Sequence, residues 1–198
     1  MSEKTVYLDN NATTMVDPQV FEAMKPYFCD LYGNPSSMHE FGGQVMHAVD
    51  KAREQVKDFL GARDAKEIIF TASGSEGDNM AIIGVLEANK NKKHIITTKI
   101  EHPAVLNVYK YLEKQGYDVT YLDVDSKGNL DLNQLAESIT DETALVSIMY
   151  ANNETGVILP VEKAAKIVKA KNPKIKFHSD AVQAAGKIPL DVKNTDID

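Results

Sequence analysis

The sequence has 198 residues, of which 43% are hydrophobic and 26% are charged, and its formal net charge is −7. These values suit a globular α/β domain and make a disordered chain a poor default. The negative charge argues against a nucleic-acid partner, because phosphate binding needs clustered lysines and arginines. No apolar run is long enough to span a bilayer, and the single cysteine, Cys29, excludes an internal disulfide. We therefore expect a cytoplasmic protein without a membrane partner.

The first third of the chain predicts a short strand followed by two helices. Residues 6–8 form the apolar run expected of the strand. Apolar residues recur at helical spacing after Pro18 and again before Gly61, which is placed to end the second helix. We expect residues 1–14 to be an N-terminal arm that contributes to a small domain and the active-site region. Residues 15–198 are expected to form an incomplete large domain.

From residue 68 onward, β-type apolar runs alternate with helical patterns. The predicted strands are 68–71, 94–98, 119–122, 144–149 and 175–178, and the predicted helices are the segment carrying Ile82 and Leu86, 103–115, 132–139 and 161–169. This alternation predicts an α/β fold with a mostly parallel, doubly wound sheet flanked by helices. Ligands bind such sheets beyond the carboxyl ends of the strands, so a site is expected in the loops after residues 71, 98, 149 and 179.

Residues 123–128 begin like a calcium-binding loop. However, Lys127 stands where an oxygen ligand is needed, and Gln134 replaces the bidentate glutamate. We predict a simple turn there and no metal site.

The loop at residues 71–79 lies between a predicted strand and a predicted helix. Its glycines and serines leave backbone N–H groups available, and a helix N-terminus favours an anion. Gly74 and Ser75 could therefore hold a phosphate. The alternative is a capping box formed by Ser73 with Glu76, or by Ser75 with Asp78.

Two further loops carry candidate ligand-binding residues. His102 could stack on an aromatic ligand or move a proton, since histidine is the residue type suited to proton transfer near neutral pH. Alternatively, it could simply flank a helix. Asn153 could orient a ring hydroxyl with its amide, although asparagine and glycine also form ordinary turns.

The loop after residue 179 places a carboxylate, Asp180, at the end of a buried strand. An unpaired carboxylate is costly there, and a protonated pyridine nitrogen would be a suitable partner. Gln183 lies within reach of a ring oxygen. The alternative for Asp180 is a helix N-cap.

Together these motifs resemble those of NifS/IscS-type cysteine desulfurases, which are fold-type-I pyridoxal-phosphate (PLP) enzymes. The segments that carry the resemblance are, in chain order, YLDNNATT, GNPSS, EHPAV, NNETG and DAVQ. Each is weak alone, but their order and spacing match the family over essentially the whole chain. The resemblance implies a homodimer that converts L-cysteine to L-alanine and passes the sulfur to an iron–sulfur scaffold protein.

The resemblance also implies roles for individual residues. Gly74 and Ser75 would hold the PLP phosphate, His102 would stack on the ring and assist proton transfers, and Asp180 would pair with the pyridinium nitrogen. The ring hydroxyl side would be bound by Asn153 and Gln183. Four residues would lie near the substrate: Asn11, Ala12, Thr13 and Asn34.

The chain departs from the family pattern in two ways. The phosphate motif reads Ala72-Ser73-Gly74-Ser75-Glu76-Gly77, with a glycine in place of the usual last serine. The Ser-Gly-His-Lys segment with the Schiff-base lysine is absent, as are the catalytic cysteine and the substrate-binding arginine. Cys29 is predicted to be an ordinary, partly buried residue.

We therefore expect a second chain to carry the remaining C-terminal part, and this chain alone to be inactive. Two other possibilities remain from the sequence. One is a different fold-type-I PLP enzyme, such as a selenocysteine lyase or a small aminotransferase. The other is a non-catalytic binding module.

Overall fold

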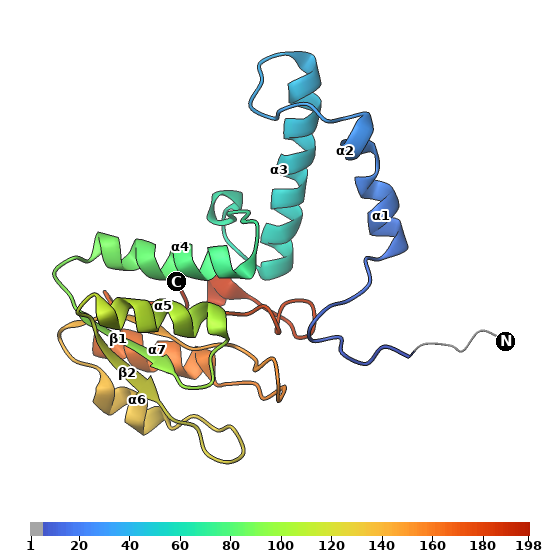
Figure 1. Cartoon of the computed structure of the whole chain (residues 1–198). Helices are drawn as coiled ribbons and strands as arrows, with labels where there is room; N and C mark the ends of the chain where they lie inside the picture. Colours follow the sequence, from blue (N-terminus) through green and yellow to red (C-terminus); the bar gives the residue numbers. More distant parts are fainter. Residues whose placement is uncertain (1–5) are drawn as a thin grey trace. The chain divides into compact units, whose positions relative to one another are not determined.

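The computed structural model describes residues 6–198, which divide after Ile68 into two compact units. The described part of the first unit contains α1 (Pro18–Met24), α2 (Pro26–Cys29), α3 (Glu40–Leu60) and the 3-10 turn η1 (Ala65–Glu67). The second unit contains α4 (Gly74–Ala88), β1 (His94–Thr98), α5 (Pro103–Lys114), β2 (Asp118–Leu122), α6 (Leu132–Ser138), β3 (Thr143–Ser147), α7 (Val161–Lys171), β4 (Lys176–His178) and η2 (Val192–Asn194). Figure 1 labels the seven α-helices of residues 6–198 and two of the strands, β1 and β2.

The start of α1 at Pro18 and the end of α3 at Gly61 are as predicted, but the first of the two expected helices is divided at Lys25 into α1 and α2. The Asp17 carboxylate accepts a hydrogen bond from the Gln19 amide at 2.7 Å and so caps α1. Gly61 ends α3 with a φ of 67°, a left-handed conformation that glycine adopts without steric cost.

Much of the apolar surface of the first unit is exposed. Val6 and Leu8 are 71% and 82% exposed, and residues 6–8 form no strand, so that prediction was wrong. A strand needs a hydrogen-bonded neighbour, and the described residues offer none to this segment. Cys29 is also exposed rather than partly buried. Residues 1–5 of the predicted arm lie outside the described residues, and the arm stays a prediction.

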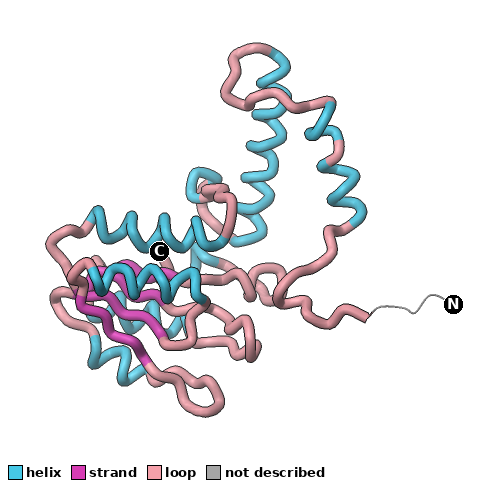
Figure 2. Tube along the Cα trace, in the orientation of Figure 1, coloured by secondary structure: helices cyan, strands magenta, loops and turns pink. Residues whose placement is uncertain are grey.

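The second unit contains a four-stranded sheet in the order β2-β1-β3-β4, and every pair of neighbouring strands is parallel. Figure 2 shows the strands in magenta with helices beside them. The predicted doubly wound α/β arrangement is confirmed for this unit. The four predicted strands from residue 94 onward are all present, with small differences at their ends.

Alternate side chains of the central strands face two different layers of helices. Ile95 and Leu145 pack with α4 and α5, whereas Ile96 and Val146 pack with α6 and α7. All residues of β1 and β3 are buried. Burial on both faces explains why these strands show no alternation of apolar and charged residues.

The predicted strand at residues 68–71 is absent. Ile68 is buried and has an extended backbone, but Ile69 and Phe70 are 62% and 50% exposed. No sheet partner for this segment exists among the described residues. The segment is apolar, as the prediction assumed. A strand also depends on a hydrogen-bonded partner, and the sequence of one segment does not show whether that partner is present.

The turn predicted in place of a calcium site is confirmed. The Asp125 carboxylate accepts hydrogen bonds from the amides of Lys127 and Asn129, at 2.8 and 2.9 Å. Residues 6–198 contain no cluster of acidic, histidine or cysteine side chains suited to a metal ion. Over the same residues, no helix combines the length and apolarity needed to cross a bilayer.

Candidate functional site

The N-terminus of α4 combines a side-chain cap with open backbone amides. Ser73 Oγ accepts a hydrogen bond from the Glu76 amide at 3.2 Å, and the Glu76 carboxylate accepts one from the Ala72 amide at 2.5 Å. This satisfies the capping alternative predicted for Ser73. It does not use the amides of Gly74 and Ser75, which stand at the start of the helix, where an anion is favoured. Capping and anion binding are therefore compatible here.

Ser75 and His102 lie on the same cavity. This cavity of about 610 Å³ lies between α4 and α5 and is also lined by Asn79 and Asn107. The two residues are 27 positions apart in the sequence, so the fold brings them together. A hydroxyl, an imidazole and two amides give the cavity mixed donor and acceptor character.

His102 is itself the N-cap of α5. Its Nδ1 accepts a hydrogen bond from the Ala104 amide at 3.1 Å, and the ring is exposed. The local bond fixes the ring orientation and leaves Nε2 and the ring face available. The helix-flanking interpretation is therefore confirmed, and the geometry is compatible with ligand binding, which stays a prediction.

Asp180 follows β4 and accepts one hydrogen bond from the segment after β3 and one from its own turn. Its carbonyl accepts from the Tyr150 amide at 2.8 Å, and its carboxylate accepts from the Val182 amide at 3.0 Å. A Cβ atom at Gly74 would lie 3.3 Å from Val182 Cγ2, so the segment after β4 passes close to the start of α4. Asp180 and the α4 N-terminus therefore belong to one edge of the sheet.

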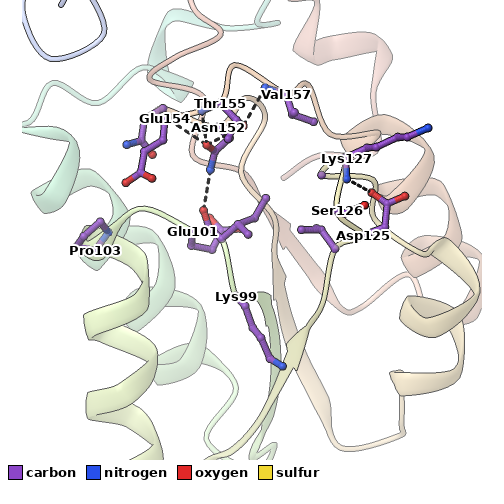
Figure 3. Close-up of a pocket in the computed structure, with 14 residues that line it drawn as sticks. Lys99, Glu101, Pro103, Asp125, Ser126, Lys127, Asn152, Glu154, Thr155 and Val157 are labelled. Atoms are coloured by element: carbon purple, nitrogen blue, oxygen red, sulfur yellow. Dashed lines mark hydrogen bonds between the residues drawn. The ribbon is translucent and has the colours of Figure 1, made fainter.

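The loop after β3 is organised by Asn152 rather than by Asn153. Asn152 Oδ1 accepts from the amides of Glu154 and Thr155, at 3.0 and 2.9 Å, while its Nδ2 donates to the Ile100 carbonyl at 3.0 Å. Asn153 lines a second cavity of about 540 Å³ at the ends of β1 and β2. Figure 3 shows this cavity with Asn152 close to Glu101.

Glu101 is a site residue that the sequence reasoning missed. It is only 4% exposed, and its Oε1 accepts hydrogen bonds from Thr98 Oγ1 and the Met149 amide, each at 2.8 Å. Burial raises the pKa of this carboxyl to about 8. The available signal was a glutamate three residues after the end of a predicted buried strand, directly before His102.

A second missed group joins α4 to β4. Asp78 is buried, and its carboxylate lies 3.5 Å from His178 Nε2, while His178 Nδ1 is 2.8 Å from Ser147 Oγ. This chain of contacts connects the helix that begins at Gly74 with the strand that precedes Asp180. It fixes the two elements that carry the phosphate and carboxylate candidates.

The remaining predicted site residues are Gln183 and four residues of the first unit. Gln183 lies in the segment after Asp180 and accepts a hydrogen bond from Lys187. The four residues expected near a substrate belong to the first unit and are all exposed: Asn11, Ala12, Thr13 and Asn34. Their roles stay predictions.

Residues 6–198 match the Aminotransferase class-V family. The chain belongs to this family. It is similar to a cysteine desulfurase from Nostoc sp. (strain PCC 7120), with 62% identity over 193 residues, which is 98% of this chain and 48% of the relative. The cysteine desulfurase NifS of Azotobacter vinelandii is 52% identical over 192 residues, 97% of this chain and 47% of the relative. The chain thus spans about half the length of the curated relatives it matches.

Solved structures of class-V aminotransferase relatives support the same fold. A NifS-like protein superposes on this chain with a TM-score of 0.94 at 46% sequence identity. The superposed region covers 98% of this chain and 53% of the NifS-like protein. A structure described as SspA in complex with cysteine gives a TM-score of 0.93 at 39% identity, with coverages of 98% and 55%. The resemblance read from the motifs is therefore confirmed, and with it the PLP fold-type-I architecture.

The residues at this edge fit the PLP on which the class-V family depends. Amides at the start of α4 suit a phosphate, the exposed His102 ring suits stacking on a pyridine, and Asp180 suits a protonated ring nitrogen. The close approach of Val182 to Gly74 leaves room for glycine but crowds a larger side chain. Two buried oxygens in this region, Glu101 Oε2 and Ser179 Oγ, have no hydrogen-bond partner within the described residues.

Proposed function

We propose that the protein carrying this chain is a PLP-dependent cysteine desulfurase that converts L-cysteine to L-alanine. The sulfur would be carried as a persulfide and passed to an iron–sulfur scaffold protein. The observation that carries the proposal is the grouping of three segments at one sheet edge: the α4 N-terminus with Ser75, the α5 N-cap His102, and the Asp180 segment beside Gly74. Similarity to proteins named cysteine desulfurase supports the choice of reaction within the family.

Each residue would have a separate task. The amides of Gly74 and Ser75, with the Ser75 hydroxyl, would bind the phosphate. Asp180 would hold the proton on the ring nitrogen, and bound PLP then supplies an electron sink for the bond broken at the substrate α-carbon. His102 would cover the ring and move a proton through its available Nε2.

The proposed enzyme also needs a Schiff-base lysine, residues near the substrate and contacts to the hydroxyl side of the ring. None of the lysines in the chain follows a Ser-Gly-His sequence, so we assign the Schiff-base lysine to none of them. The first-unit residues Asn11, Ala12, Thr13 and Asn34 are proposed to lie near the substrate. Asn153 and Gln183 are proposed to contact the hydroxyl side of the ring. A homodimer with a cytoplasmic location, completed by the C-terminal part, is the proposed working form.

The direct test is product analysis with the full-length natural protein that contains this chain. With PLP and a thiol reductant, L-cysteine should yield sulfide and L-alanine in equal amounts. Parallel reactions with L-selenocysteine alone, and with an amino acid plus a 2-oxo acid, separate a selenocysteine lyase and an aminotransferase from a desulfurase. Transamination without sulfide would reject the proposal, and so would a protein that binds no PLP.

Two substitutions at His102 should separate ring stacking from proton transfer. His102→Phe keeps an aromatic ring, so cofactor affinity should change only a few-fold, while the rate should fall by about 10²–10⁴-fold. His102→Asn keeps a side-chain cap for the Ala104 amide but removes the ring, so cofactor affinity should fall by roughly tenfold. Fluorescence titration with PLP and sulfide release measure the two effects. Equal rates for wild type and His102→Phe would remove His102 from the proton-transfer role.

A further inference from the structure

Glu101 is hydrogen-bonded to the ends of two neighbouring strands and directly precedes His102, a residue of the proposed cofactor site. Its Oε1 receives one hydrogen bond from Thr98, the last residue of β1, and one from the Met149 amide, just beyond β3. The bond from Asn152 Nδ2 to the Ile100 carbonyl makes a second link between the same two segments. Figure 3 shows this link as a dashed line at the mouth of the cavity. The next residue in the chain is His102, so these bonds set the position from which α5 and its N-cap begin.

The surroundings of Glu101 disfavour a negative charge. The carboxyl group is almost fully buried, and its Oε2 has no hydrogen-bond partner among the described residues. The acidic groups Asp78 and Asp180 are close enough to act on it electrostatically. Burying a charge next to like charges is costly unless a cation compensates it.

No cation in the described part of the chain pairs with Glu101. Lys99 lines the same cavity, but its amine lies 2.7 Å from the Asp123 carboxylate, and its side chain points away from Glu101 in Figure 3. His178 is paired with Asp78 and Ser147. The titratable groups around Glu101 are Asp78 on α4, Tyr109 and His102 on α5, His178 and Asp180 at β4, and Lys99 and Glu154 on the cavity wall.

We propose that Glu101 is a positioning residue that acts as a neutral carboxylic acid, holding His102 and the segment after β3 in place without adding a second negative charge beside Asp180. This inference rests on the proposed function, because it assigns Asp180 to the ring nitrogen of the cofactor. Ionisation of Glu101 leaves a buried charge that can be relieved only by opening the two strand-end bonds to water. That opening displaces His102 and weakens cofactor binding.

The sign of the pH dependence follows from the raised pKa. Because burial raises the pKa of Glu101 to about 8, the neutral form predominates below that pH and is lost above it. Cofactor affinity should therefore be constant at neutral pH and fall in alkaline solution. At one pH unit above the pKa of Glu101 in the cofactor-free protein, cofactor affinity should be about tenfold lower, if Glu101 stays protonated in the cofactor-bound protein.

The test compares wild type with Glu101→Gln, which is neutral at every pH and keeps an oxygen for the Thr98 and Met149 donors. The ligand is pyridoxine 5′-phosphate, which has no aldehyde and so binds without a Schiff-base lysine. Its dissociation constant is measured on the full-length protein from pH 6 to 9.5 by calorimetry. The quantity compared is the dissociation constant of wild type divided by that of Glu101→Gln. We expect this ratio to be near 1 at pH 6.5 and to rise to about 10 at pH 9. Glu154→Gln, an exposed neighbour on the same cavity, should follow the wild-type curve at every pH.

Three other results would overturn the inference, and they are distinguishable. If the ratio of dissociation constants stays near 1 up to pH 9.5 and binding is tight throughout, Glu101 does not have the proposed role, and the proposed function is unaffected. Weak binding by Glu101→Gln already at pH 6.5, with the far-ultraviolet circular dichroism of wild type, shows that the charge is required. Failure of wild type to bind pyridoxine 5′-phosphate at any pH rejects the proposed function and the inference together.

Discussion

Replacement of Asp180 by asparagine should lower cysteine-dependent sulfide release by at least about 30-fold. The asparagine oxygen can still accept the hydrogen bond from the Val182 amide, now 3.0 Å from the carboxylate, so the local turn should survive. What is lost is the negative charge that we propose pairs with the ring nitrogen. Removing one partner of a buried charge pair costs about 2–5 kcal/mol, which corresponds to the stated loss or more.

Asp131→Asn is the matched control for this measurement. Asp131 accepts a hydrogen bond from the Asn133 amide at 2.8 Å and caps α6 in the same manner, but it lines neither cavity of the site. Its rate should equal that of wild type. If the two variants lose activity equally, or if Asp180→Asn keeps full activity, Asp180 is not the partner of the ring nitrogen.

Replacement of Phe177 by alanine should destabilise the protein by about 3–5 kcal/mol. Phe177 lies on β4 with no exposed surface, and it packs in the cluster formed by the sheet with α6 and α7. Truncation loses the transfer free energy of the ring and leaves a cavity that a close-packed core cannot fill. Urea unfolding, followed by circular dichroism, measures the change as a lower midpoint at constant slope.

Phe177→Leu provides the graded comparison. It keeps most of the apolar volume, so its cost should stay near 1–1.5 kcal/mol. Comparable losses for leucine and alanine would mean that ring shape, rather than cavity volume, decides the stability of this layer. A loss below 1 kcal/mol for alanine would contradict the burial of β4.

The order and type of the elements in the second unit could be predicted because two local signals agreed. The central strands carry short runs of apolar and β-branched residues. Glycine, proline or a capping residue separates them from helices whose apolar residues recur every three or four positions. The segment at 68–71 gave the same apolar signal without becoming a strand. Strand formation depends on a partner far away in sequence, and one segment cannot report whether that partner is present.

The candidate site could be predicted only where its residues stand in short, characteristic loops. Gly74, Ser75, His102 and Asp180 all follow the ends of apolar runs or precede helices, so their shared edge was inferable from the topology of parallel sheets. Glu101 was missed because its importance depends on burial and on a bond to Met149, 48 residues away. The contact between Asp78 and His178 spans 100 residues and was equally invisible.

The strand order also has a consequence for how the protein is made. β1 pairs with β2 soon after both are synthesised, but its other neighbour, β3, begins 49 residues after the start of β1, at Thr143 compared with His94. At about 5–20 residues per second, a ribosome takes roughly 2–10 s to cover that interval. During this time one edge of β1, a strand that is buried throughout in the folded chain, lacks its partner. Unpaired strand edges in a partly made chain are prone to aggregation, so this interval is one in which chaperones would act on the nascent protein.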